Sequence, residues 1–294
     1  MIYALQDFID AVSLGCLYAL FALSIAMIYG VARIVNFANG ELMTIAGYSL
    51  LMTGFIGNVP ALLVGLSAPI IVALAMERFA FRRILDAPLP TLMVMSLGLS
   101  LFIKNLILIV FGSRPLGISF ATFLSEPVHV GALHVTALNI VVIVTLAVLG
   151  GGLMFVLKRS SIGLQLRAAA EDLKMARLVG VRANRVVAAS FAISAVMAAA
   201  AGIILALQVG TVSYALGGRA VIFGFIASVL GGLGSIAGAA LGGFLIGFCT
   251  VLAQLILPPN ISPFRDAFVF AAVILVLLFR PEGLFVVFGR RQRA

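Results

Sequence analysis

The chain has 294 residues, of which 63% are hydrophobic and 10% are charged, whereas a soluble domain carries about 25% charged residues. This composition excludes a large soluble domain and indicates a protein embedded in a membrane. The formal net charge of +9 does not indicate nucleic-acid binding, because long apolar stretches separate the basic residues and leave no continuous stripe for a phosphate backbone.

Several stretches are long enough to cross a bilayer, which requires about 20 apolar residues per helix. Because some of them are short or broken by glycine, the sequence predicts eight or nine spans. We therefore expect an all-α fold, a polytopic transmembrane helical bundle with broken helices, forming one domain over residues 1–294. Asp7 and Asp10 stand where a signal peptide would carry basic residues, so no cleaved signal is expected. The expected spans are residues 8–30, 42–57, 60–81, 91–112, 136–157, 187–209, 219–233, 236–257 and 266–280.

Lysine and arginine residues orient these spans. Of the 19 basic residues, 14 fall in three groups, at residues 78–83, 158–185 and 280–293, and alternating spans can place all three groups on one side. Since positively charged loops stay inside, that side is expected to be the cytoplasm. Residues 113–135, with Arg114 as their only basic residue, then face outward. The N-terminus lies outside if there are nine spans and inside if there are eight.

Polar residues interrupt the apolar run over residues 29–48. Polar groups are costly in hydrocarbon unless they are satisfied, and Asn39 followed by Gly40 is a turn signal, so a helix is expected to stop and restart here. Two interpretations remain open: an interfacial turn with an Arg33–Glu41 ion pair, or a discontinuous helix that lines a solute path. The candidate path and gating residues are Arg33, Asn36, Asn39, Gly40 and Glu41.

The connection over residues 158–186 is too long for an ordinary loop, since helix connections usually have about two to eight residues. Ser160 or Ser161 can cap a helix here, and Gly180 can end it. The residues between them are good helix formers with one apolar face. The segment is either a connecting helix held by its own charges or, as we favour, a helix that binds a partner on the cytoplasmic side.

Residues 229–247 are rich in glycine but lack the Gly-Lys-Ser/Thr ending of a nucleotide-binding loop. Gly234, Gly238 and Gly242 recur at four-residue spacing, which lets helices approach closely. We expect a second helix break here that matches the break in the first half, although no internal sequence repeat supports the pairing. The residues of this second-half break are Gly231, Gly232, Gly234 and Ser235.

The sequence carries no recognisable catalytic machinery. It has no paired carboxylates within the spans, no cluster with metal-ligand spacing and no Ser/His/Asp set, so an enzyme is not expected. Lys104 lies within a span, where satisfaction inside the bundle is expected rather than path lining. Glu41 is the only clear intramembrane acid, which favours a pore whose energy comes from elsewhere over a proton- or sodium-driven transporter.

Four segments together resemble the integral-membrane permeases of Liv-type branched-chain amino acid ABC importers, in particular their H-type subunit. GCLYALFALSIAMIYGVARIVNFANGE (15–41) resembles the family's N-terminal signature, and IGLQLRAAAEDLKMARLVGVRANRV (162–186) resembles its cytoplasmic coupling segment. VLGGLGSIAGAALGGFLIG (229–247) and LLFRPEGLF (277–285) resemble its C-terminal signatures. The resemblance extends over almost the whole chain.

The resemblance implies a non-catalytic permease subunit of an importer complex in a bacterial inner membrane. The implied partners are a second permease subunit, of a different but homologous chain, two ATP-binding-cassette ATPases and a periplasmic solute-binding protein. ATP and Mg are expected on the ATPases, and no cofactor is expected in this chain. The implied solute is small and polar, a branched-chain or other amino acid. The residues expected to couple to the ATPase are Gly163, Arg167, Ala168, Ala169, Ala170, Glu171, Asp172 and Gly180.

The chain departs from the family pattern at three positions. The family usually has histidine at the position of Asn39, a lysine around Phe223 and an acid near Thr250. These departures bear on the solute more than on the fold. An importer of urea, short amides or small organic acids with the same architecture therefore stays an alternative, as does a stand-alone secondary transporter or channel.

Overall fold

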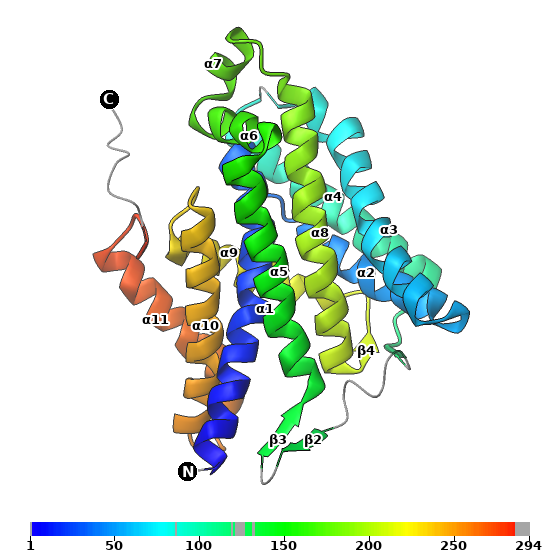
Figure 1. The fold of residues 1–294 in the computed structure, drawn as a ribbon, viewed down its shortest axis with the longest axis vertical. Helices are drawn as coiled ribbons and strands as arrows, with labels where there is room; N and C mark the ends of the chain where they lie inside the picture. Colours follow the sequence, from blue (N-terminus) through cyan, green and yellow to red (C-terminus); the bar gives the residue numbers. More distant parts are fainter. Residues whose placement is uncertain (1, 86, 119, 121–126, 131–132, 286–294) are drawn as a thin grey trace.

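A computed structural model of the chain describes residues 2–85, 87–118, 120, 127–130 and 133–285. Within these residues, apolar helices form one bundle and two shorter helices lie across one of its ends (Figure 1). The helices of the bundle are α1 (Ile2–Ala32), α2 (Asn39–Thr53), α3 (Asn58–Phe79), α4 (Leu89–Phe111), α5 (Ala137–Arg159), α8 (Ala183–Val209), α9 (Leu216–Gly231), α10 (Ile236–Ile256) and α11 (Arg265–Phe279). The two short helices at the end are α6 (Ser161–Glu171) and α7 (Leu173–Leu178).

The predicted polytopic helical fold is confirmed, and two of the predicted spans differ from the rest in length. Seven helices of the described chain are long and apolar enough to cross a membrane, namely α1, α3, α4, α5, α8, α10 and α11. The predicted spans 42–57 and 219–233 correspond to α2, with 15 residues, and α9, with 16. Both are shorter than the roughly 20 residues that a bilayer core requires.

Small residues allow the central helices to pack closely. α1 and α8 are the most buried of the seven long helices, and they pack against each other. Residues 198–201 of α8 are four alanines, all buried, and Gly202 follows directly against the backbone of Met43 in α2. Gly243 and Gly247 of α10 lie against the backbone of α1 in the same way. Because lipid removes the hydrophobic driving force between helices, such close packing of small residues contributes strongly to their association.

The two halves of the bundle repeat one packing pattern in opposite orientations. α1 packs against α9 and α10, and α8 packs against α2 and α3, while α2 pairs with α3 as α9 pairs with α10. α1 runs toward the end that carries α6, and α8 runs away from it (Figure 1). This is the pattern of an inverted-topology repeat, in which helices α8–α11 correspond to α1–α4. The sequence contains no convincing repeat because the correspondence lies in the packing and not in the side chains.

α2 and α9 both begin inside the bundle, at the place where they contact each other. Asn39, the first residue of α2, bonds to Ser24, which precedes the end of α1 by eight residues, or about 12 Å at 1.5 Å per residue. Gly40 and Gly217 lie in backbone contact, so the starts of α2 and α9 abut. Residues 33–38 and 210–215, which precede them, are not helical and enter the bundle from opposite ends. α2 and α9 are short because each crosses only part of the bundle.

The second helix break therefore lies at a different place from the predicted one. The counterpart of residues 33–38 is residues 210–215, where the sequence predicted only a connection between spans. Residues 231–235 instead form the turn between α9 and α10, at the end that carries α6. Glycine is dense there because α9 and α10 touch at Gly231 and Gly238, not because a helix is interrupted at mid-depth.

Two small antiparallel ribbons, which the all-α prediction did not include, lie at the end opposite α6 (Figure 1). β2 (Pro127–Val130) pairs with β3 (Leu133–Thr136) as a hairpin before α5. β1 (Leu116–Gly117) pairs with β4 (Thr211–Val212), and this pairing fixes the connection that leads into α9. The start of α1 lies at this same end, as the nine-span topology predicts.

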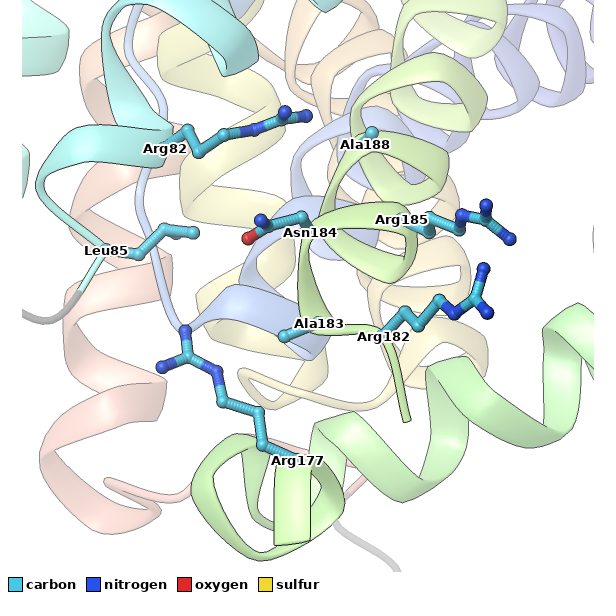
Figure 2. Close-up of a pocket in the computed structure, with 8 residues that line it drawn as sticks. All are labelled: Arg82, Leu85, Arg177, Arg182, Ala183, Asn184, Arg185 and Ala188. Carbon is cyan, nitrogen blue, oxygen red and sulfur yellow. The ribbon is translucent and has the colours of Figure 1, made fainter. Parts of the chain in front are cut away.

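Basic residues are concentrated at the end that carries α6 and α7. Arg82, Arg177, Arg182 and Arg185 all line one pocket there, with a volume of about 760 Å³. Figure 2 shows Arg82 and Arg177 on one side of the start of α8, while Arg182, just before this helix, and Arg185, in its first turn, extend toward the other side. By the positive-inside rule, this concentration of basic residues predicts that the end carrying α6 faces the cytoplasm.

Site-directed labelling tests this orientation. A cysteine introduced at position 129, in the β2–β3 hairpin, is expected to react with an impermeant thiol reagent added to intact cells. A cysteine at position 174, in α7, is expected to react only after the membrane is opened. The native Cys16 and Cys249 are replaced by alanine as background, since both are free thiols. Labelling of position 174 and not of position 129 in intact cells contradicts the orientation.

Candidate functional site

Asn39 lies in a closed hydrogen-bonded cluster between α1, α2 and α8. Its Nδ2 donates to Ser24 Oγ at 2.7 Å, and Ser194 Oγ donates to Asn39 Oδ1 at 3.1 Å. Ser194 Oγ also lies 2.5 Å from the backbone carbonyl of Ser24. All three side chains are fully buried. Because these bonds satisfy the buried amide, the cluster fixes the start of α2 against the two central helices.

A second polar contact joins α2 to α9. The backbone N–H of Gly217 donates to Thr44 Oγ1 at 3.0 Å, and Thr44 Oγ1 in turn donates to the carbonyl of Gly40 at 3.2 Å. Gly40 and Gly217 can approach this closely because neither has a Cβ atom. The start of α9 is therefore held by the first turns of α2, so a displacement of one short helix moves the other.

Two of the predicted path residues keep a polar atom without a partner in the described part of the chain. Asn36 Oδ1 accepts from the backbone N–H of Ala38 at 3.1 Å, while its Nδ2 has no hydrogen bond. Glu41 Oε1 accepts from Ser100 Oγ at 3.1 Å, while its Oε2 has none. Both residues are almost completely buried. Unsatisfied buried polar atoms are rare in native proteins, so both atoms are candidates for contact with a water molecule, an ion or a solute.

Arg33 does not form the ion pair with Glu41 that one interpretation of the sequence expected. It is the only non-glycine residue with a positive φ, 56°, among those the structure describes, and its backbone N–H still bonds to Tyr29 at the end of α1. Its guanidinium donates to the carbonyl of Ala170, in α6, at 3.3 Å. Arg33 therefore links the break between α1 and α2 to α6.

The segment predicted as one helix consists of two, because Asp172 begins a new helix. Ser160 Oγ caps α6 by accepting from the N–H of Gly163 at 2.9 Å. Asp172 Oδ1 accepts from the N–H groups of Lys174 and Met175, at 2.8 and 3.0 Å, and so caps α7. Gly180, with a φ of 91°, follows the end of α7. Capping at both positions fixes the angle between the two helices.

α6 is anchored on the bundle by its buried side. Gly163 packs against the backbone of Val156 and Leu157 at the end of α5, and Ala169 is buried beside it. Ala168 and Ala170 are half-buried, and Arg167 and Glu171 lie on the exposed side. Arg167, Ala170 and Glu171 share a cavity of about 330 Å³ with Gly234, from the turn between α9 and α10. The structure thus brings predicted coupling residues together with the second-half glycines.

The remaining residues of the α9–α10 turn have local structural roles. Ser235 Oγ accepts from the N–H of Gly238 at 3.0 Å and caps α10. Gly232 and Gly234 have φ values of 101° and 96°, which side chains rarely adopt, so the turn requires glycine at both positions. The N–H of Gly232 bonds to the carbonyl of Val229, and the N–H of Ser235 bonds to the carbonyl of Gly232, so these bonds stay within the turn.

Exposed apolar side chains on α7 were not predicted by the sequence pattern. Met175, Leu178 and Val179 are 61%, 81% and 79% exposed, at the end of the bundle that carries α6 and α7. Helical periodicity identified the buried side of the segment, which faces the bundle, but it gave no signal for this second apolar surface. Exposed apolar groups gathered at one place are typical of surfaces that contact another protein or a membrane.

Comparison with known proteins identifies the family. A family model described as "Branched-chain amino acid transport system / permease component" matches residues 8–278. The chain is 33% identical over 294 residues to the high-affinity branched-chain amino acid transport system permease protein BraD of Pseudomonas aeruginosa, covering 95% of each chain. It is 34% identical over 299 residues to the corresponding LivH protein of Escherichia coli K12, covering 96% of each.

A shorter stretch also resembles a sugar permease. Over 112 residues the chain is 38% identical to the xylose transport system permease protein XylH of Escherichia coli K12, covering 36% of this chain and 28% of that protein. The two full-length relatives and the family match agree with the polytopic helical fold described above. The chain therefore belongs to the family of branched-chain amino acid transport system permease components.

Proposed function

We propose that this chain is the membrane permease subunit of an ATP-driven importer, and that α6 and α7 receive the movement of an ATPase subunit. The observation that carries the proposal is the hydrogen bond from Arg33 to the carbonyl of Ala170. Ala170 lies in the last turn of α6, and Arg33 is the first residue after α1, where the break between α1 and α2 begins. α6 is also anchored on α5 through Gly163, so a force on α6 reaches two places in the bundle.

α2 and α9, which each cross only part of the bundle, are suited to convert that force into a change in which side of the membrane the solute path opens to. Displacement of residues 33–38 moves the start of α2, and the Gly40–Gly217 contact carries this movement to α9. Rigid displacement of packed helices by small shifts is a common basis of switching. We thus propose that Arg33 and Asn39 act indirectly in gating, by positioning α2. The other residues proposed to line or gate the path are Asn36, Gly40 and Glu41.

The partners are proposed from the family and from the exposed surface. A second permease subunit, two ATP-binding-cassette ATPases and a solute-binding protein complete the importer, and ATP and Mg bind to the ATPases. The apolar surface of Met175, Leu178 and Val179 supports docking of an ATPase on α7. The complex lies in a bacterial inner membrane, and the chain itself is not catalytic, in keeping with the permeases it is similar to.

The proposed solute is a branched-chain or other small amino acid. Two relatives that match along nearly their whole length are named as branched-chain amino acid permeases. The shorter likeness to a xylose permease indicates that the shared helices do not define the solute by themselves.

Purification of the tagged chain from its native membrane in mild detergent tests the proposal. We expect ATPase subunits and a second permease to co-purify in stoichiometric amounts, and vesicles containing the complex to take up leucine only with ATP and a solute-binding protein. A chain that purifies alone and moves leucine in liposomes without ATP contradicts the importer assignment and supports a stand-alone transporter.

A further inference from the structure

Glu41 is a carboxylate inside the bundle without a charged partner in contact. It is 4% exposed, and its only hydrogen bond in the described residues is the one from Ser100 Oγ to Oε1. Its Oε2 is buried and has no partner there. An ionisable side chain in the membrane interior is costly, and such residues mark the route or site of a ligand.

Lys104 supplies the opposite charge on the facing helix. It lies one helical turn after Ser100 on α4, and α4 packs against α2. Its ammonium group lies 5.6 Å from the centre of the Tyr214 ring, and Lys104 stands four residues after Ser100, whose hydroxyl bonds to Glu41. The two side chains nevertheless form no ion pair within 4 Å. α2 and α4 therefore present one carboxylate and one ammonium group that are near each other and not joined.

An apolar cavity of about 400 Å³ begins one helical turn from this pair, between α2, α3 and α4. Ile45 lies four residues after Glu41 on α2, and Ile103 lies three residues after Ser100 on α4, and both line the cavity. Tyr48 lines it too, and its buried hydroxyl has no hydrogen bond in the described chain. The volume lies within the range of about 300–1,000 Å³ for small-molecule sites.

We propose that Glu41, Ser100 and Lys104, with the adjoining cavity, form a binding site for a zwitterionic amino acid with an aliphatic side chain. Glu41 and Ser100 bind the ammonium group, Lys104 binds the carboxylate, and the side chain enters the cavity beside Ile45 and Ile103. The proposal rests on the amino acid import proposed above and assigns residues to it.

Other occupants satisfy only part of this arrangement. A lipid acyl chain fills the cavity but leaves both charges unpaired. A sugar supplies neither charge and leaves the apolar walls without contact. An amino acid carries both charges on one carbon with the side chain beside them, so a single ligand satisfies the carboxylate, the ammonium group and the apolar walls together.

Photo-crosslinking with a diazirine analogue of leucine tests the site in vesicles that contain the complete transport system. With ATP present, adducts are expected on the peptides that carry Ile45 and Ile103, and excess leucine is expected to remove them. Glu41→Gln and Lys104→Gln are each expected to lower the adduct yield about tenfold or more, because each removes a charged partner of a buried ligand group. Asn105→Ala is the matched control, since Asn105 adjoins Lys104 but is exposed and bonds only to the backbone of Leu101.

Analogues separate the two charges. Glu41→Gln is expected to lose the preference for leucine over its analogue without the amino group, and Lys104→Gln the preference over its analogue without the carboxyl group. Adduct yields are normalised to assembled complex, and Ser100→Ala serves with Lys104→Gln if Glu41→Gln fails to assemble. Adducts elsewhere with normal leucine uptake overturn the site and leave the importer assignment intact. The same holds if variants and control behave alike. Absence of leucine uptake by the unaltered complex overturns the proposed solute and the site together.

Discussion

Gly217→Ala is expected to destabilise the permease and to reduce uptake at least tenfold. A Cβ atom at position 217 would meet the backbone C, O and Cα atoms of Gly40, which cannot move away as a flexible side chain can. The starts of α2 and α9 must then separate, and the bond from Gly217 N–H to Thr44 Oγ1 lengthens with them. Overpacking a well-packed interior costs about 1–3 kcal/mol, and contact between two backbones belongs at the upper end. Thermal unfolding in detergent and uptake in vesicles measure the two effects.

The neighbouring glycine provides the control for this experiment. A Cβ atom at Gly218 would have no atom within 4 Å, so Gly218→Ala changes the same residue type in the same turn of α9 without a clash. Gly40→Ala, made from the other side of the contact, is expected to behave as Gly217→Ala does. If Gly217→Ala unfolds at the same temperature as Gly218→Ala and transports normally, then α2 and α9 are not in backbone contact.

The sequence predicted the first helix break and missed the second because the signals differ in kind. Asn36, Asn39 and Glu41 stand close together in an apolar run, so their polarity alone marks a break. The only polar side chains of residues 210–215 are the hydroxyl groups of Thr211, Ser213 and Tyr214, while residues 231–235 contain more glycine. Gly231 and Gly238 allow α9 and α10 to come into backbone contact. A local run of glycine looks the same whether it serves such a contact or interrupts a helix.

The sequence predicted the limits of the helical connection over residues 158–186 but not its division into two helices. Helix-forming residues and the caps at Ser160 and Gly180 define its limits correctly. Asp172 was counted as one more residue of the helix, whereas its side chain caps α7 and divides the segment. Aspartate suits both a helix surface and an N-cap, so only the backbone geometry decides between the two.

The placement of Glu41 beside Ser100 and one helical turn from Lys104 depends on tertiary structure. The sequence marked Glu41 as an intramembrane acid and Lys104 as a separate residue to be satisfied within the bundle. About sixty residues separate them, and only the packing of α2 against α4 brings them to one place. A single sequence carries no information on which helices are neighbours, so the site could not be assembled from it.

Leu178→Asp is expected to remove the ATPase from the complex while the permease itself stays folded. Leu178 is 81% exposed, and Met175 and Val179 beside it are exposed as well, so the substitution removes no contact within the bundle. At an interface, a buried apolar anchor contributes about 2 kcal/mol or more, and an unpaired carboxylate in its place adds a desolvation cost. We therefore expect the ratio of ATPase to permease after purification to fall at least tenfold, and uptake to fall with it.

Leu178→Met separates this explanation from a general effect of substitution at α7, because methionine keeps an apolar side chain of similar size. The ratio of ATPase to permease in Leu178→Met is expected to stay close to that of the unaltered chain. Thermal unfolding of each purified permease shows whether the bundle is intact. We expect both variants to unfold at the temperature of the unaltered chain, because Leu178 is 81% exposed. An unchanged ratio in Leu178→Asp means that the ATPase does not dock on α7, and that the exposed apolar surface there serves another partner.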